Sequence, residues 1–413
     1  MNCRHCNQAL EHVFLDLGFA PLSNAYLTDD NLKEPESHYP LKLFVCDQCW
    51  LVQTEDYASA KAIFRSDYAY FSSVSQSWLD HASRYVKQVS ASFELDEKSS
   101  VIEIASNDGY LLKNFVAAGI PCLGIEPTAS TAAAAEALGI PVLHKFFGHD
   151  TAELLANENR QADLVIGNNV YAHVPDINDF TLGLKTLLKP KGVITLEFPH
   201  LLRLIEGNQF DTVYHEHFSY LSLQTVSKIF EQAGLRVWDV EHLPTHGGSL
   251  RVYGCHADNP RATTAAVQKS LAEEQRYGLQ RLSTYQAFQK CADQVKTDLL
   301  FYLIEQKRAG KTVAAYGAAA KGNTLLNYAG IKPDLLTYVC DAAPSKQGKY
   351  MPGSHIPIVE PTMLRERRPD NVLILPWNIA EEVFTQNDHI FEWGGRFVTA
   401  IPQLRVINER TVV

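Results

Sequence analysis

A short run in the middle of the chain, DTVYHEHFSYLSL from Asp211 to Leu223, is dense in side chains that can move protons. Its segment Tyr214 to Tyr220 holds two histidines, a glutamate and two tyrosines. The spacing does not fit a zinc protease, whose histidines lie four residues apart in H-E-x-x-H on a helix. On a strand, Glu216 and His217 would point to opposite faces and could not share one pocket. We therefore expect a turn or loop that carries out acid–base chemistry; a packed polar segment without a catalytic role is the alternative. We expect His215 to be a supporting or surface residue and Tyr220 to be a packing residue.

Two CxxC pairs near the start of the chain form a second chemical motif. They comprise Cys3, Cys6, Cys46 and Cys49. Each pair can present two thiolates to one tetrahedral zinc, and four protein ligands leave no open position for a substrate. The spacing therefore predicts a structural zinc, with four buried free cysteines as the alternative. His5 is a further candidate ligand, although its position inside the first pair favours an exposed side chain.

Elements that could position these groups begin near residue 100, where short apolar runs alternate with helical segments, the pattern of a doubly wound α/β sheet. SVIEIASNDGYLLKNFVAAG predicts a strand, a turn and a helix, and CLGIEP, PVLH, ADLVIGNNV and GVITLEFP predict further strands. Ligands bind such sheets at the carboxyl ends of the strands. Glu103 lies near the end of the first strand and Glu126 ends the second, where a carboxylate can hold ribose hydroxyls.

The first turn of this sheet resembles motif I of S-adenosylmethionine-dependent methyltransferases, E-x-G-x-G-x-G. Ala105 and Asn107 stand where that motif has glycines, and Gly109 is retained. A dinucleotide-binding turn would need G-x-G-x-x-G, so a dinucleotide site is disfavoured.

The C-terminal third repeats the strand–turn–helix theme in KTVAAYGAAAKGNTLLNYAG. Its helix start could receive a phosphate, although Lys321 could also be a solvated lysine. A further strand leads into a loop rich in glycine and proline. The candidate ligand contacts in this region are Lys321, Asn323, Thr324, Lys346 and His355.

The segment HGGSLRVY predicts a glycine-rich turn that enters a strand. Its glycines permit close backbone approach, so His246 and Arg251 could touch a ligand or a domain interface. A plain hairpin turn is the alternative.

The order of motifs along the whole chain is more selective than any one of them. Paired CxxC, YFSSVSQSW, EIASNDGYLL, NNVYAHVPD, YHEHFSYLS, HGGSLRVY and GAAAKGNTLLNY follow one another. This order resembles the family of S-adenosylmethionine-dependent C-methyltransferases that act on nucleotide-linked ketosugars in deoxysugar biosynthesis.

The resemblance implies a fold with three parts and a helical connection: a zinc-binding domain (1–65), a methyltransferase domain (66–258), a helical linker (259–308) and a C-terminal Rossmann-like domain that contributes to nucleotide-sugar binding (309–413). It implies catalytic roles for His217, Tyr214, Glu216, His173 and Asn169. It implies cofactor contacts from Tyr70, Glu103, Ala105, Asn107, Gly109, Tyr110, Glu126 and Asn168.

The implied reaction is methylation of a ring carbon beside a ketone. A base removes the α-proton, and hydrogen-bond donors stabilise the enolate oxygen. His217 is nominated as the base, because imidazole titrates near neutral pH. We expect methylation at C3 in preference to C5 of a dTDP- or GDP-linked keto-deoxysugar. The alternatives are O- or N-methylation of a small molecule and a non-enzymatic zinc-ribbon adaptor.

Bulk properties restrict the partners. The formal net charge of −10 argues against a nucleic-acid partner, which would need clustered lysine and arginine. The sequence contains no run of about 18 apolar residues, so we expect no membrane-spanning helix. The first residues lack the pattern of a secretory signal. We expect a cytoplasmic protein with no membrane partner.

Overall fold

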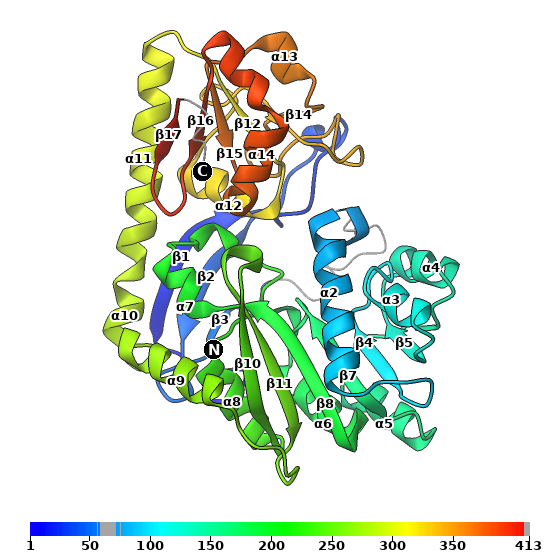
Figure 1. Ribbon diagram of the computed structural model, residues 1–413. Coiled ribbons are helices and arrows are strands. Elements are labelled where there is room, and N and C mark those ends of the chain that lie inside the picture. Colours follow the sequence, from blue (N-terminus) through cyan, green and yellow to red (C-terminus); the bar gives the residue numbers. More distant parts are fainter. Residues whose placement is uncertain (56, 58–71, 75, 409–413) are drawn as a thin grey trace.

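The computed structural model describes residues 1–55, 57, 72–74 and 76–408, which form three β-sheets with helices around them (Figure 1). The predicted α/β class, with a cysteine-bearing N-terminal part and two Rossmann-like sheets, is confirmed. Among the described residues, the helices are too short or too polar to span a lipid bilayer.

The N-terminal sheet has four antiparallel strands in the order β1-β2-β3-β9. Its strands are β1 (His12–Ala20), β2 (Tyr39–Val45), β3 (Val52–Thr54) and β9 (Ser219–Tyr220), and η1 (Asn31–Lys33) lies between β1 and β2. The fourth strand comes from the middle of the chain: Val52 lies opposite Tyr220, and Gln53 lies opposite Ser219. The residues just after His217 are therefore part of the sheet that the N-terminal segment builds.

The central sheet has seven strands in the order β10-β11-β8-β7-β4-β5-β6. The strands β4 to β8 are parallel, and their spatial order is 3-2-1-4-5 from β6 to β8, the arrangement of a doubly wound sheet. Their bounds are β4 (Val101–Ile104), β5 (Cys122–Ile125), β6 (Val142–Leu143), β7 (Ala162–Asn168), β8 (Leu188–Pro199), β10 (Leu235–Leu243) and β11 (Ser249–His256).

Helices cover both faces of the central sheet. Successive residues of its strands point to opposite faces, and each face forms its own apolar cluster with the helices that cover it. One face packs on α2 (Gln76–Ser92), α3 (Leu112–Ala117) and α4 (Ala129–Ala137). The other packs on α5 (His149–Asn157), α6 (Ile177–Leu187) and α8 (Leu223–Gln232). Shorter elements here are η2 (Ser72–Val74), η3 (Tyr171–His173), α7 (Leu201–Glu206), η4 (Phe210–Thr212) and η5 (Thr245–Gly247).

The C-terminal sheet has the order β14-β13-β12-β15-β16-β17, which is 3-2-1-4-5-6 in its own strand numbering. Its strands are β12 (Val313–Tyr316), β13 (Val339–Cys340), β14 (Ile358–Val359), β15 (Asn371–Ile374), β16 (Arg396–Thr399) and the antiparallel β17 (Arg405–Ile407). The helices before and around it are α9 (Ala265–Tyr277), α10 (Leu282–Gln286), α11 (Phe288–Arg308), α12 (Ala320–Ala329), α13 (Met363–Arg367), η6 (Trp377–Ile379), α14 (Ala380–Gln386) and η7 (Asp388–Trp393).

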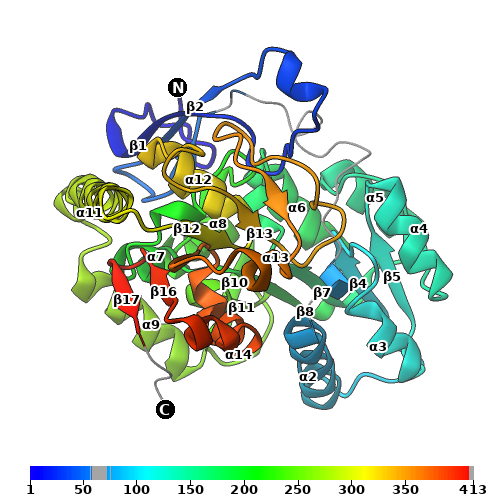
Figure 2. The same cartoon turned by 90° about the horizontal axis from the view of Figure 1, so that it is seen from above.

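A single hydrophobic core joins the N-terminal sheet to the C-terminal sheet. It runs from β1 and β2 through α11 and α12 to β12 and β15, and Figure 2 shows α11 and α12 beside β1 and β2. Phe14 stacks on Phe288 with 4.9 Å between the ring centroids. The apolar residues of the N-terminal sheet thus belong to a core that is shared with the C-terminal sheet and its helices.

The first turn of the central sheet keeps a left-handed backbone without most of the glycines that usually supply it. The φ angles of Ala105, Asn107 and Gly109 are 55°, 50° and 75°. Asparagine tolerates this region, whereas alanine is strained there by about 1–2 kcal/mol. A Cβ atom on Gly109 would lie 2.4 Å from Ile140 Cδ1, so packing also requires this glycine. Ala105, which stands where motif I has a glycine, therefore carries local backbone strain.

The substitution Ala105→Gly should relieve this strain and raise the free energy of unfolding by about 0.5–1 kcal/mol. Ala117→Gly, on the exposed end of α3, is the matched control and should lower it by about 0.5–1 kcal/mol. Urea unfolding of both variants measures the difference. A destabilised Ala105→Gly protein would show that Ala105 is not strained.

Candidate active site and metal centre

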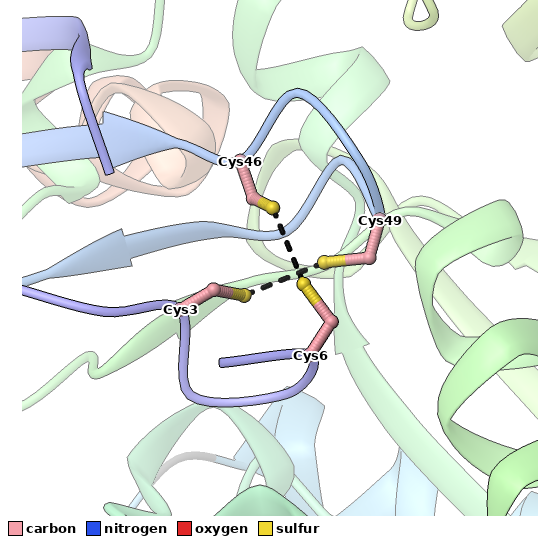
Figure 3. A group of neighbouring side chains, drawn as sticks. All are labelled: Cys3, Cys6, Cys46 and Cys49. Atoms are coloured by element: carbon pink, nitrogen blue, oxygen red, sulfur yellow. Dashed lines mark hydrogen bonds between the residues drawn. The ribbon is translucent and has the colours of Figure 1, made fainter. Parts of the chain in front are cut away.

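The four cysteines of the CxxC pairs converge on one point between two loops (Figure 3). Cys3 Sγ lies 3.4 Å from Cys49 Sγ, and Cys6 Sγ lies 3.5 Å from Cys46 Sγ. All four sulfur atoms lie within 4.8 Å of one another. A tetrahedral zinc with Zn–S bonds of about 2.3 Å places its ligands about 3.8 Å apart. The cluster therefore fits zinc, and its four thiolates would complete the coordination sphere of a structural ion.

The first cysteine pair is fastened to the start of α6. Asn178 Nδ2 donates to the carbonyl oxygens of Arg4 and His5 at 3.2 and 2.9 Å. His5 Nδ1 lies 2.9 Å from Asn178 Oδ1. The expectation of an exposed His5 is wrong, because this histidine is buried against Asn178. Its ring thus helps to dock the metal loop on the central sheet.

Hydrogen bonds connect the metal-binding segment directly to the YHEH sequence. The Thr54 amide donates to the Phe218 carbonyl at 3.2 Å, and Thr54 Oγ1 donates to the His217 carbonyl at 3.2 Å. From the other side, the Phe218 amide donates to the Ala172 carbonyl at 2.8 Å. The backbone at His217 is therefore held between β3 and η3.

The YHEH sequence forms the expected turn, with the His217 amide donating to the Tyr214 carbonyl at 3.0 Å. Aromatic rings surround His217: its centroid lies 4.1 Å from that of Tyr214 and 4.6 Å from that of His173. Tyr220 packs behind it, and its hydroxyl accepts from the Tyr214 amide at 3.3 Å. His215 faces away, is buried, and donates from Nε2 to the Pro40 carbonyl at 3.2 Å.

Side chains from other elements complete the cluster around the turn. His173 Nδ1 donates to the Glu216 carbonyl at 2.9 Å, which fixes its tautomer. Glu216 Oε1 accepts from Asn24 Nδ2 at 2.8 Å. Asn169, with a φ of 53°, places its amide nitrogen 3.5 Å from His246 Nε2. Asn24 carries no sequence signal, since it is a single amide in the loop after β1.

Three histidines of the cluster favour the neutral form. Burial lowers the pKa of His173 and of His246 to about 4. Burial and the neighbouring His173 lower the pKa of His217 well below its usual value, against a hydrogen bond to the Thr212 carbonyl. At neutral pH these imidazoles are therefore unprotonated and free to accept a proton, but their lowered pKa makes them weaker bases than a solvated histidine.

A carboxylate just after β5 accepts hydrogen bonds from the predicted cofactor turn and from the residues that follow the carboxylate itself. Glu126 accepts from the Asn107 amide at 3.0 Å and from the Thr128 amide at 2.9 Å. The Ser72 amide donates to Asn107 Oδ1 at 3.0 Å, so Ser72 packs on the turn. Tyr70 lies outside the described residues.

Buried polar atoms around this turn have capacity for a ligand. Among the described residues, Glu103 Oε2, Asp108 Oδ1 and Asn168 Oδ1 are buried without a hydrogen-bond partner. Burial, Asp108 and Glu126 raise the pKa of Glu103 well above its usual value. A sulfonium cofactor with ammonium and ribose groups fits these acceptors. The ring of Tyr110, which follows this turn, stacks on the ring of Trp78 with 6.1 Å between the centroids. Trp78 was not among the site residues expected from the sequence.

The helix start of α12 lies against the YHEH region. Thr324 Oγ1 donates to the Val213 carbonyl at 2.7 Å, and Asn323 Nδ2 donates to the Ser23 carbonyl at 2.6 Å. Lys321 Nζ donates to Asn378 Oδ1 at 2.5 Å, and lies 5.0 Å from the centre of the Trp377 ring. Lys321 is thus held by protein groups at the boundary between the C-terminal sheet and the turn.

Three other predicted substrate contacts have protein partners. Arg251 is buried, with Glu197 at 2.7 Å and Glu241 at 3.0 Å. Lys346 Nζ donates to the Ala318 carbonyl at 2.8 Å, within the C-terminal sheet's own first turn. His355 pairs with Glu36 at 2.8 Å on the surface. Their contact with substrate stays a prediction.

Family models match three successive segments of the chain. These are "Putative zinc binding domain" over residues 3–64, "Methyltransferase domain" over residues 77–240 and "C-methyltransferase C-terminal domain" over residues 244–402. The C-methyltransferase NovU of Streptomyces niveus is 34% identical over 411 residues, which cover 100% of this chain and 98% of NovU.

Solved structures resemble about half of the chain. The 1,6-didemethyltoxoflavin-N1-methyltransferase of Burkholderia thailandensis is 14% identical, covers 50% of this chain and 95% of its own, and has a TM-score of 0.37. The magnesium protoporphyrin IX methyltransferase of Synechocystis is 14% identical, covers 43% and 83%, and has a TM-score of 0.34.

Loss of the metal should loosen the YHEH turn, because Thr54 lies on the strand that follows the second cysteine pair. We expect Cys46→Ser to release zinc and to speed amide hydrogen exchange at Thr54 and Phe218 by at least about tenfold. Exposed Cys291→Ser on α11 is the matched control and should change neither quantity. Unchanged exchange in a zinc-free Cys46→Ser protein would disprove the coupling.

Proposed function

We propose, since this chain belongs to the family of S-adenosylmethionine-dependent C-methyltransferases, that its acceptor is a ring carbon of a nucleotide-linked 4-keto-deoxysugar. C3 is the preferred position, with C5 as the other carbon beside the ketone. The full-length match to a C-methyltransferase disfavours both O- or N-methylation and the adaptor alternative.

The observation that supports a ketone-activating reaction is the neutral, ring-lined His217. A carbon acceptor must first lose a proton, and a C–H bond becomes acidic enough when a carbonyl lies beside it. His217 lies with Tyr214 and His173 on one side of the turn, with centroid separations of 4.1 and 4.6 Å. A neutral base surrounded by hydrogen-bonding side chains is what such a step requires.

Each residue has a role in this proposal. His217 removes the α-proton, and its imidazolium is stabilised by the Thr212 carbonyl. Tyr214 and His173 orient the His217 ring. Glu216, held by Asn24, and Asn169, near His246, hold hydroxyl groups of the sugar. S-adenosylmethionine, when bound, supplies an electrophilic methyl group.

The cofactor is proposed to lie at the carboxyl ends of β4, β5 and β7, where the unpaired acceptors of Glu103 and Asn168 lie. Asn168 and Asn169 are consecutive at the end of β7. Asn168 carries one of the unpaired acceptors at the proposed cofactor site, and Asn169 approaches His246. This adjacency would let the methyl donor and the acceptor carbon meet at one place.

Deuterium exchange into a keto-sugar tests the proposal without the methyl donor. We expect the wild-type protein to exchange one ring proton of a dTDP- or GDP-linked 4-keto-6-deoxysugar in D₂O, because His217 forms the enolate by itself. His217→Asn should lower this exchange by at least about 100-fold. The exchanged carbon, read by NMR, separates C3 from C5.

His144→Asn, an exposed histidine that pairs with Glu136, is the matched control and should exchange at the wild-type rate. Calorimetry with S-adenosylmethionine should give equal affinities for all three proteins. Undiminished exchange in His217→Asn would remove its assignment as the base, and wild-type protein inert toward every keto-sugar would overturn the proposed substrate class.

A further inference from the structure

A lysine of the C-terminal part lies close enough to the proposed base for its positive charge to lower the pKa of His217. Lys321 is in the first turn of α12, whose Thr324 donates to the carbonyl of Val213, the residue before Tyr214. The ammonium group is fixed by Asn378 Oδ1 at 2.5 Å and by the face of Trp377. The position of the Lys321 ammonium group is therefore set by Asn378 and Trp377.

Trp377 connects this lysine to two loops of the central part. Its indole Nε1 donates to Asp211 Oδ2 at 2.8 Å, in the short helix that leads into the YHEH turn. A Cβ atom on Gly247 would lie 2.5 Å from Trp377 Cη2, so the indole edge touches the loop that carries His246. Trp377, whose ring face lies against the Lys321 ammonium group, thus contacts both the segment before the YHEH turn and the His246 loop.

Two ionisable groups of opposite charge lie together here, the Lys321 ammonium group and the Asp211 carboxylate. Lys321 carries three N–H donors, and the described residues provide one acceptor for them, Asn378. Asp211 is buried, and its Oδ1 has no hydrogen-bond partner among the described residues. Burial lowers the pKa of Lys321 and raises that of Asp211 to about 6, while the attraction between the two groups opposes both shifts.

We propose that Lys321 is a further catalytic residue, whose ammonium group donates a hydrogen bond to the ketone oxygen of the substrate and stabilises the enolate. This inference rests on the proposed function. His217 takes the α-proton, the C–H electron pair becomes the carbon–carbon double bond, and the carbonyl electron pair moves to oxygen beside Lys321. Carbon then takes the methyl group, the C–S bond breaks, and the proton on His217 leaves to solvent.

The geometry favours this role over contact with the diphosphate, which the sequence suggested. A diphosphate brings two negative charges, and the neighbouring Asp211 carboxylate would repel them in a partly buried site. A ketone is neutral when it binds and becomes negative only as the α-proton leaves. A fixed cation at that oxygen stabilises the transition state more than the bound substrate, so it acts on rate.

Lys321→Met tests the assignment, because methionine keeps the chain length and removes the charge. We expect α-proton exchange without methyl donor, and kcat for methylation, to fall by at least about 100-fold. The affinity for S-adenosylmethionine and for the free nucleoside diphosphates dTDP and GDP should stay within about threefold of wild type. Exposed Lys311→Met is the matched control and should change none of these quantities.

Lys321→Arg is the second variant, for use if Lys321→Met does not fold. It keeps the positive charge at this position. Arginine would serve a phosphate as well as lysine does, whereas its larger planar head cannot occupy the same point beside Asn378. We expect kcat to fall at least about tenfold with nucleotide binding unchanged. Weakened dTDP and GDP binding with near-normal exchange in either variant would overturn the assignment in favour of a phosphate contact.

The same measurements distinguish failure of this inference from failure of the proposed function. Wild-type exchange that survives unchanged in Lys321→Met removes only the role of Lys321. Wild-type protein that exchanges no proton of any keto-sugar tested overturns the substrate class, and the role of Lys321 with it.

Discussion

The pairing of β3 with β9 is the interaction on which the arrangement of the site depends. The YHEH turn has no regular secondary structure, so its backbone must be held by neighbours. Two residue pairs, Val52–Tyr220 and Gln53–Ser219, join it to the strand that follows the second cysteine pair. Because Cys46 and Cys49 lie just before that strand, a metal bound by the four cysteines would help to hold the backbone at His217.

The two Rossmann-like sheets share one device and use it differently. In the central sheet, Glu126 accepts from the Asn107 amide of the first turn; in the C-terminal sheet, Asp341 accepts from the Ala318 amide at 2.7 Å. In the second case, Lys346 and Tyr26 also bond to the Ala318 carbonyl, at 2.8 and 2.6 Å. The chain's own side chains thus occupy the second turn.

Local patterns predicted much of this structure, and long-range contacts explain the rest. Alternating apolar runs predicted the parallel sheets, and the spacing within each CxxC pair and within YHEH predicted the cysteine cluster and the turn, because these patterns can be recognised in short stretches of sequence. The sequence contained no signal that β9 would join the N-terminal sheet, that Asn24 would bind Glu216, or that Trp377 would bind Asp211. His5 was expected to be exposed, since its partner Asn178 is remote in sequence.

The central claim is that His217, held by the N-terminal sheet, meets a carbon acid at the edge of the central sheet. A crystal structure with S-adenosylhomocysteine and a nucleotide-linked 4-keto-sugar tests it most directly. The account predicts a ring nitrogen of His217 within about 3.5 Å of the carbon beside the ketone, and that carbon facing the sulfur atom. A sugar bound elsewhere, with the His217 ring enclosed by protein, would contradict it.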